Sequence, residues 1–326
     1  MRKGTCLLGK ADTITRQYMN DSTIFADAFN FWVYNGRQVI QPEQLQPLNT
    51  TAVETLFTSD GKNVPIQKIR DTLKYLTVMT DDAAAYAVLG IENQTDIHYA
   101  MPVRTMLYDA LEYTGQIQRI AAKHKQYREF GTTNGEYLSG FYKNDRLLPV
   151  ITLVIYFGPD EWDAPVSLHE MMQTDNRELL QQVENYKIRL IAPQQLTSED
   201  VQKFQTTLGP VLQFIKHFKE KEKLELLLQD ETFQKIDYTA AMVINSCTHA
   251  KFTFEKSEGV VNMCKALDDI REECREEGRT SARIEERKKF AVNLLQSNMP
   301  VEFVAKMIPD FPLETILQLK QELQNV

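Results

Sequence analysis

The sequence predicts an α/β domain followed by an all-helical C-terminal region, and three observations support this fold class. Segments of strand type alternate with helical segments up to about residue 195, an order that favours a mixed sheet flanked by helices. Strand signals vanish from Ser198 onward, where apolar residues recur at helical spacing. With 326 residues, of which 43% are hydrophobic, the chain can bury a sizeable core.

The first predicted element is a helix that begins after Asp21-Ser22 and ends at Asn35-Gly36. Asp is a preferred residue before a helix, and Asn-Gly tolerates the left-handed backbone that ends one. The apolar face expected on this helix contains Ile24, Phe25, Ala28, Phe29 and Trp32. A short strand is expected near Val39-Ile40 within a polar, turn-rich stretch.

The sheet is expected to form from four further segments and a crossover helix. Strand patterns span about 68–79 and 84–92, with turn residues between them at Thr80-Asp81-Asp82. Pro102 suits the first turn of a long helix that runs toward Gln126. A buried strand follows at Val150–Phe157, then a helical pattern over 167–185 and a strand at Tyr186–Ala192.

The C-terminal part is predicted to be helical over 201–229, 233–248 and 260–290, with two short helices between Met299 and Leu323. These two could form a DNA-reading helix pair, but the second offers Lys320 as its single cation, which favours helix packing or dimerisation instead. We therefore expect three regions: 1–195, 196–255 and 256–326.

Bulk composition narrows the classes of function. A net charge of −8 argues against tight nonspecific coating of DNA, although residues 116–128 contain four cations and no acid. The four cysteines form no C-x-x-C pair, which favours reduced thiols over a disulfide framework or a zinc site. No apolar run reaches the ~18 residues of a membrane span. Together these features predict a cytoplasmic protein without a membrane partner.

Two carboxylates stand at strand ends in a pattern that suits a metal. Glu92 ends the apolar run 86–91, and Gln94 points to the same side because side chains alternate along a strand. Asp71 lies in the preceding strand-like segment. Carboxylates brought together in this way can bind a divalent cation, and such a cation can activate water against a phosphodiester.

Five segments resemble one protein family. YAVLGIENQT (86–95) and AMPVRTMLYDALEY (100–113) resemble the recombination-promoting nucleases, also described as PD-(D/E)XK nuclease family transposases. The same resemblance extends to IFADAFNFWVYNG (24–36), LLPVITLVIYFG (147–158) and YKIRLIAPQ (186–194). It implies that residues 1–195 form a PD-(D/E)XK, restriction-endonuclease-like mixed sheet flanked by helices.

The resemblance also implies roles for single residues. Asp71 and Glu92 would hold Mg²⁺ or another divalent cation, and Gln94, at a position where the wider superfamily carries Lys, would orient the attacking water. Asp27 would be a further ligand, unless it is a solvated acid on a helix. Arg104 and Tyr108 match the pattern M-P-x-R-x-x-x-Y. Arg104 would contact a phosphate or form a salt bridge. Apart from the resemblance, Arg119, Lys123 and Lys125 belong to the basic stretch 116–128 and would either bind DNA or lie on a solvated face.

The function implied is that of a metal-dependent DNA endonuclease that promotes recombination or acts in mobile-element or phage-defence biology. Cutting both strands is simplest with two active sites, so a homodimer is a second expected partner besides DNA. The alternative is a weakly active or inactive nuclease-fold protein regulated by its own C-terminal region, in the manner of a toxin and its antitoxin. Met263 and Met242 are two positions at which such a separate fragment could begin.

Overall fold

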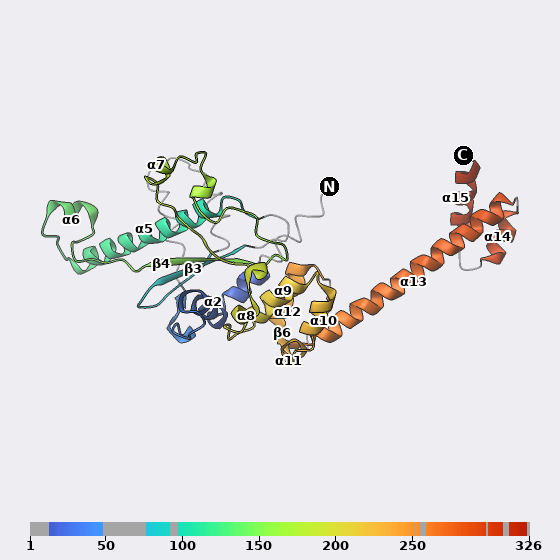
Figure 1. Ribbon diagram of the computed structural model, residues 1–326, viewed down its shortest axis with the longest axis horizontal. Coiled ribbons are helices and arrows are strands. Elements are labelled where there is room, and N and C mark those ends of the chain that lie inside the picture. Colours follow the sequence, from blue (N-terminus) through green and yellow to red (C-terminus); the bar gives the residue numbers. More distant parts are fainter. Residues whose placement is uncertain are drawn as a thin grey trace. The chain divides into compact units, whose positions relative to one another are not determined.

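A computed structural model describes residues 13–47, 76–91, 97–250, 252–254, 259–297, 299–308 and 313–324 (Figure 1). The chain forms two compact units, Met1–Met263 and Cys264–Val326. The first unit contains the sheet, and the second is helical in its described residues. Each unit is considered by itself below.

The first unit is built on a five-stranded mixed sheet with strand order β1-β2-β3-β4-β5. The β1–β2 and β2–β3 pairs are antiparallel, whereas β3–β4 and β4–β5 are parallel, so the predicted mixed α/β sheet is confirmed. The strands are β1 Gln46–Pro47, β2 Leu76–Thr80, β3 Ala85–Ile91, β4 Val150–Tyr156 and β5 Arg189–Ile191. The predicted strand at 68–79 is described from Leu76 onward.

Residues 13–19 are helical, and the next helix, α2 (Ser22–Tyr34), begins and ends where the sequence predicts. The carboxylate of Asp21 accepts a hydrogen bond from the backbone N–H of Thr23, and Asn35 ends the helix with φ of 54°. Gly36 follows with φ of 86°, and a Cβ at this position would lie 2.8 Å from Cβ of Lys203. The predicted apolar face needs one correction, because Trp32 is 40% exposed.

The strand predicted at Val39-Ile40 does not form. The side-chain oxygen of Asn30 accepts hydrogen bonds from the backbone N–H groups of Val39 (3.1 Å) and Ile40 (2.8 Å), and its amide donates to the Ile40 carbonyl (2.9 Å). This fully buried side chain therefore supplies the hydrogen bonds that a neighbouring strand would otherwise provide. A 3-10 turn, η1 (Pro42–Gln44), follows.

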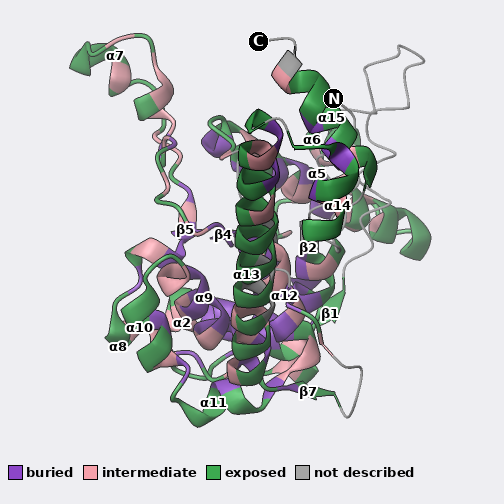
Figure 2. Ribbon diagram, turned by 90° about the vertical axis from the view of Figure 1, so that its right-hand side faces the viewer, coloured by how far each residue is buried: buried purple, intermediate pink, exposed green. Residues whose placement is uncertain are grey.

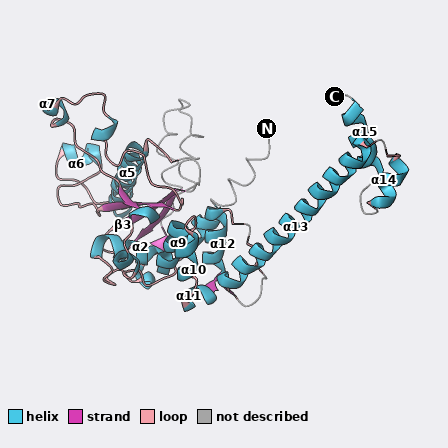
Figure 3. Cartoon of the chain, turned by 45° about the vertical axis from the view of Figure 1, so that its right-hand side comes forward, coloured by secondary structure: helices cyan, strands magenta, loops and turns pink. Residues whose placement is uncertain are grey.

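Helices cover both faces of the sheet (Figure 3). The crossover helix α5 (Met101–Tyr127) joins the parallel strands β3 and β4 and has Pro102 in its first turn, as predicted. On one face, Met101 and Tyr108 of α5 pack in a cluster with Val154, Tyr156 and residues of the β5 segment. On the other face, the ring of Phe29 in α2 lies 4.9 Å from that of Tyr86 in β3. The short helix α6 (Asn134–Ser139) follows α5.

The helix predicted over 167–185 is wrong. This segment contains a 3-10 turn, η2 (His169–Met171), and a four-residue helix, α7 (Arg177–Leu180). The backbone N–H of Leu168 donates to the Tyr186 carbonyl, and that of Ile188 donates to the Val166 carbonyl. The two ends of the segment therefore pair with each other through an antiparallel bridge between Ser167 and Lys187, which withdraws them from a single helix.

The rest of the first unit is mostly helical, but it is not purely so. A turn, η3 (Pro193–Gln195), leads into five helices that replace the two long ones predicted: α8 Ser198–Val201, α9 Leu208–His217, α10 Lys221–Leu227, α11 Glu231–Gln234 and α12 Tyr238–Thr248. Two strands of two residues each, β6 (Ile236–Asp237) and β7 (Val260–Val261), pair antiparallel. They correct the expectation that strands are absent after Ser198.

The described residues of the second unit form three helices: α13 (Met263–Gln296), whose first residue still belongs to the first unit, α14 (Val301–Met307) and α15 (Leu313–Gln324). Residues of all three helices share one apolar core, which includes Ala291, Leu295, Val304, Ile316 and Leu319. The predicted pair of short C-terminal helices is thus confirmed. Gly278 does not break α13, which is continuous and mostly exposed along its length (Figure 2).

Candidate functional site

The predicted metal ligands Asp71 and Glu92, together with Gln94, lie outside the described residues. The strands that flank them are described, however. Leu76, the first residue of β2, pairs with Leu89 near the end of β3, and Ile91 pairs with Tyr156 at the end of β4. The start of β2 and the ends of β3, β4 and β5 therefore lie along one edge of the sheet. We call this the site edge.

Several side chains tie the loops of the site edge together. The hydroxyl of Tyr99, just before α5, donates to both carboxylate oxygens of Asp163, at 3.0 and 2.9 Å. Asp163 belongs to the loop after β4. In the same loop, Trp162 packs edge-on against Tyr156, with the two ring centroids 5.5 Å apart. The amide of Gln194 donates to the Pro159 carbonyl at 2.7 Å. In sheets with parallel strands, ligands bind beyond the carboxyl ends of those strands, which is where these loops meet.

Arg104 and Tyr108 lie on the first turns of α5. Nε of Arg104 is 3.5 Å from the hydroxyl of Tyr108, which is buried against the sheet at 3% exposure, while Arg104 is half-buried. His98 precedes the helix, and desolvation together with the positive charge of Arg104 lowers its pKa. The neutral form of His98 is thereby favoured, which leaves Arg104 as the cation of this group.

Arg119 and Lys123 lie much farther along the same helix. With a rise of 1.5 Å per residue, they are about 22 and 29 Å from Arg104. The Arg119 guanidinium is 2.5 Å from a carboxylate oxygen of Glu112, and Lys123 is exposed. His124 also contacts Glu129 and Asp145, so acids from outside residues 116–128 offset the predicted basic patch.

Asp27 is buried at 1% exposure, and it does not lie on a solvated face of α2. Its carboxylate accepts hydrogen bonds from the backbone N–H of Gln205 (3.0 Å), from the N–H of Thr206 (2.9 Å) and from the Thr206 hydroxyl (2.6 Å). These bonds give Asp27 a structural role in holding the turn before α9. Its role as a metal ligand stays a prediction.

A second polar cluster, which the sequence reasoning missed, lies between α5 and the sheet. Asp109 accepts hydrogen bonds from the hydroxyls of Thr152 (2.5 Å) and Tyr186 (2.7 Å). Burial raises the pKa of Asp109, while these two hydrogen bonds and Arg189 act in the opposite direction. Nη1 of Arg189 is buried, and it makes no hydrogen bond within the described structure. The sequence feature that could have revealed this cluster is a polar pair, Thr105 and Asp109, four residues apart on one face of helix α5.

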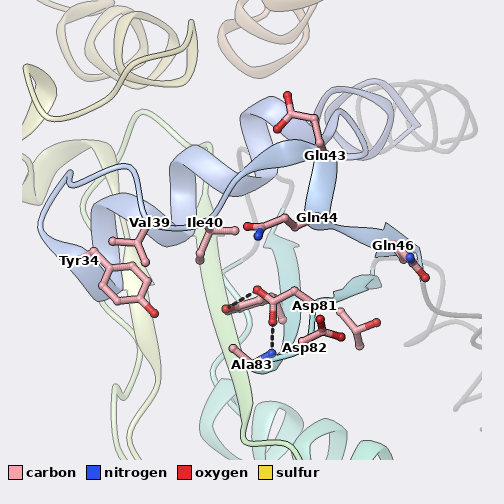
Figure 4. A pocket seen from close by; sticks show the side chains of 11 residues that line it. Tyr34, Val39, Ile40, Glu43, Gln44, Gln46, Asp81, Asp82 and Ala83 are labelled. Atoms are coloured by element: carbon pink, nitrogen blue, oxygen red, sulfur yellow. Dashed lines mark hydrogen bonds between the residues drawn. The ribbon is translucent and has the colours of Figure 1, made fainter.

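The β2–β3 turn, at the other end of the hairpin, borders a pocket of about 490 Å³ (Figure 4). Glu43, Asp81 and Asp82 line it together with Tyr34 and Tyr86. The carboxylate of Asp81 accepts hydrogen bonds from the N–H groups of Ala83 and Ala84 and from the Tyr86 hydroxyl, which fixes the turn. Strand β3 separates this pocket from the site edge by about 20 Å.

Within the described ranges, no three His, Cys, Asp or Glu side chains are grouped so that they could hold a metal ion. None of the helices in those ranges is long and apolar enough to span a bilayer.

Comparison with known proteins gives one match. A family model described as putative transposase, YhgA-like, matches residues 70–242, more than half of the chain. No curated protein and no solved structure matches the chain. The matched residues include the β2–β3 hairpin, α5, β4 and β5, and they also contain Asp71, Glu92 and Gln94.

Proposed function

The chain belongs to the YhgA-like transposase family, and on this premise we propose that it is a metal-dependent DNA endonuclease. One observation carries the proposal. Asp71 lies five residues before the start of β2, and Glu92 directly follows the end of β3. Because Leu76 pairs with Leu89, the first residue of β2 and the end of β3 lie together at the site edge, which supports the proposal that the two acids share a cation.

The residue types predicted for the site fit the proposed chemistry. Asp71 and Glu92 supply carboxylate oxygens, the ligands that Mg²⁺ prefers in proteins. When bound, such a cation activates water and offsets charge on a phosphodiester. Gln94 has an amide that can accept a hydrogen bond from the attacking water and so orient it, although a neutral amide lacks the charge that a Lys would bring.

Arg104 is the described residue best placed to bind a phosphate. It lies at the start of the helix that follows Glu92, and Tyr108 lies beside it. A guanidinium forms charge-assisted hydrogen bonds to phosphate oxygens in a fixed planar geometry. We propose that Arg104 grips the phosphate at or next to the cleaved bond. Arg119 and Lys123, if they bind DNA, would contact it more than about 20 Å away along α5.

The mixed sheet adds support through its order of elements. An antiparallel β1–β2–β3 meander, then the α5 crossover and the parallel strand β4, is the arrangement expected of a PD-(D/E)XK nuclease domain. In this family, cleavage would serve recombination, mobile elements or defence against phage.

The test is plasmid cleavage by the full-length protein with and without Mg²⁺. We expect Asp71→Asn and Glu92→Gln each to reduce cleavage by at least about a hundredfold, since each removes a charged ligand. The matched control is Asp82→Asn, which changes an exposed acid at the far end of the β2–β3 hairpin and should cleave normally. Equal cleavage by the wild type and both site variants would show that a contaminant is responsible, and it would refute the proposal.

A second function is favoured by the boundary between the two units. The second unit begins at Cys264, directly after Met263, which is also the first residue of α13. We propose, as the alternative, that residues 263–326 are also made as a separate chain that restrains the full-length protein. Replacing the Met263 codon by a Leu codon should remove a short product from cells that express the gene. A short product that persists in this variant would contradict an internal start at Met263.

A further inference from the structure

A loop at the far end of α5 carries large apolar side chains that no part of the described structure covers. Residues 127–146, which we call the α6 loop, contain α6 and lie beyond the last turns of α5 (Figure 1). Four of their apolar side chains are mostly exposed: Tyr127 (62%), Phe130 (83%), Tyr137 (79%) and Leu138 (83%). Large apolar side chains gathered on a surface, unlike single ones, mark interaction sites.

Internal contacts hold the α6 loop in its conformation. The carboxylate of Glu136 accepts hydrogen bonds from the backbone N–H groups of Thr132 (2.7 Å) and Lys143 (2.9 Å), which closes the loop. The ring of His124 in α5 stacks on that of Tyr142, with the ring centroids 3.8 Å apart. A loop held in this way presents its exposed rings already ordered, so a ligand that binds them loses less conformational entropy.

The exposed side chains of the α6 loop come from segments that touch each other. A Cβ on Gly131 would lie 2.7 Å from Cβ of Glu136 and 3.3 Å from the backbone nitrogen of Tyr137. The chain next to Phe130 therefore runs against the first turn of α6, in which Leu138 follows Tyr137. This neighbourhood makes the exposed side chains one patch.

The surroundings of this patch are positively charged. Residues 120–146 contain five cations and three acids, a net charge of +2, in a chain whose net charge is −8. The acids are engaged nearby, because two of them contact His124 and the third, Glu136, accepts backbone hydrogen bonds. Four exposed cations form no ion pair with any described residue: Lys123, Lys125, Arg128 and Lys143.

Exposed rings among such cations suit a nucleic acid whose bases are unpaired. Cations complement its phosphates, and the free face of each base can stack on a ring, whereas neighbouring pairs cover the base faces inside a duplex. The location also suits this ligand. Tyr127 is about 34 Å from Arg104 along α5, so a strand that reaches the site edge can extend to the α6 loop.

We propose that the α6 loop binds an unpaired strand of nucleic acid, with Phe130 and Tyr137 stacking on bases and Lys125 and Lys143 contacting phosphates. This inference rests on the proposed function, because it gives the cleaved DNA a second contact far from the site edge. The loop would then select substrates that contain a single-stranded segment. Binding can be measured without cleavage, so the two proposals can fail separately.

The first test is fluorescence anisotropy with the full-length protein in EDTA, which prevents metal-dependent cleavage. The probes are a labelled oligothymidine of about 20 nucleotides, longer than the ~4–16 nucleotides of common single-strand sites, and a DNA duplex of the same length. We expect the wild type to prefer the single strand. Phe130→Ala combined with Tyr137→Ala should weaken single-strand binding by at least about tenfold and leave duplex binding unchanged.

Two controls accompany the double alanine variant. Phe130→Tyr combined with Tyr137→Phe keeps both rings and should bind like the wild type. Leu226→Ala changes an apolar side chain of α10 that is 66% exposed, and it should also bind normally. Equal binding by the wild type and the double alanine variant, or an equal loss of single-strand and duplex binding, would overturn the proposal.

The second test concerns the phosphates. Lys125→Gln and Lys143→Gln should each reduce the slope of log affinity for oligothymidine against log salt by about 0.7, the value for one phosphate contact on a single strand. Lys221→Gln, a change to an exposed cation of α10, should leave the slope unchanged. Slopes unaffected by both substitutions in the α6 loop would refute its contact with phosphates.

Two further probes distinguish other ligands. An oligouridine RNA of the same length offers unpaired bases too: tighter binding of the DNA assigns the loop to the cleaved substrate, whereas tighter binding of the RNA would overturn that assignment. Rings beside cations also suit an anionic membrane, which pelleting with phosphatidylserine vesicles measures. Vesicle binding that is lost in the double alanine variant, with oligothymidine binding unchanged, would overturn the proposal.

Comparison with plasmid cleavage separates this inference from the proposed function. If the wild type cleaves DNA with Mg²⁺ but its single-strand binding does not depend on Phe130 and Tyr137, the inference about the α6 loop fails alone. If single-strand binding depends on these rings but the protein does not cleave, the proposed endonuclease fails alone.

Discussion

The carboxylate of Asp27 accepts a 2.6 Å hydrogen bond from the hydroxyl of Thr206, a residue 179 positions away in the sequence. Asp27 also accepts from the backbone N–H groups of Thr206 and Gln205, which lie between α8 and α9. The backbone here donates to a side chain, so it cannot continue the helical hydrogen bonding of α8. One buried acid thus joins α2 to the helices that follow the sheet and separates α8 from α9.

Replacing Asp27 by Asn should destabilise the protein. The amide keeps one acceptor but turns NH₂ hydrogens toward the N–H groups of residues 205 and 206, which leaves buried donors unsatisfied. We expect the free energy of unfolding to fall by about 1–3 kcal/mol. Thermal or denaturant unfolding measures this change.

The control for Asp27→Asn is the exposed Asp82→Asn, which should leave unfolding unchanged. The Asp27→Asn variant also separates the two roles of Asp27. A purely structural role predicts lower stability with unchanged Mg²⁺ dependence of cleavage. Normal stability combined with a raised Mg²⁺ requirement would show instead that Asp27 is a metal ligand.

Local signals in the sequence were sufficient for the elements whose boundaries depend on neighbouring residues. Asp21 acts through a side-chain hydrogen bond to a backbone N–H two residues away, and Asn35-Gly36 and Pro102 act through their own backbone geometry. All of these effects are local, and α2 and α5 begin or end at these residues. The helix predicted over 167–185 failed for the opposite reason. Its ends pair through Leu168 and Tyr186, a contact that no local pattern reveals.

The candidate site shows the same division. Arg104 and Tyr108 share a face because of their spacing, which the sequence contains, and the structure places them together. The burial of Asp27 and the ion pair between Arg119 and Glu112 depend on packing and rotamers, which spacing does not determine. The sequence did not predict the polar cluster around Asp109, because its partners, Thr152 and Tyr186, come from distant segments.

Gly158 allows the ring of Tyr156 to lie against the backbone after β4. A Cβ at position 158 would lie 2.1 Å from the Tyr156 hydroxyl oxygen and 2.2 Å from Cζ, much closer than van der Waals contact. Gly158→Ala should therefore push Tyr156 from its place beside Trp162 and cost about 1–3 kcal/mol in unfolding free energy. In a Tyr156→Ala background, the same change should cost less, because the clash is gone.

The control for Gly158→Ala is Gly278→Ala, the same substitution at an exposed position. A Cβ at position 278 has no atom within 4 Å, and the residue lies inside α13. Ala favours a helix by about 1 kcal/mol over Gly, so this variant should stabilise α13. If Gly158→Ala were equally harmless in denaturant unfolding, Tyr156 would have a second position available at no cost.

His124 links the end of α5 to the loop that follows. Its ring stacks on that of Tyr142, with the ring centroids 3.8 Å apart. Its two nitrogens contact carboxylate oxygens of Asp145 (2.9 Å) and Glu129 (2.5 Å). The hydrogen bonds to Asp145 and then to Glu129 raise the pKa of His124 above 6.5. The resulting stabilisation is fully present below pH 6.5 and is lost as pH rises through the folded-state pKa.

Histidine signals in an NMR titration measure this pKa directly. We expect a value above 6.5 for His124 in the wild type and a lower value in Asp145→Asn, which removes the largest contribution. Lys123→Met, a change to an exposed neighbour on the same helix, should raise it slightly by removing a positive charge. A pKa unaffected by Asp145→Asn would show that the contact between the two side chains does not persist in solution.

Arg104 provides a sharp prediction about how substrate binds. If its guanidinium grips a phosphate at the site edge, Arg104→Lys keeps the charge but loses the planar pair of donors, and Arg104→Ala loses both. A hydrogen bond to a charged group contributes about 1.5–3 kcal/mol, so kcat/KM for DNA cleavage should fall roughly tenfold to a hundredfold in Arg104→Ala and less in Arg104→Lys.

Arg119→Ala is the matched control, since this residue is about 22 Å farther along α5 and is paired with Glu112. Unfolding midpoints of all three variants should stay close to that of the wild type. A larger effect of Arg119→Ala than of Arg104→Ala would move the phosphate contact away from the site edge, toward the far end of the helix.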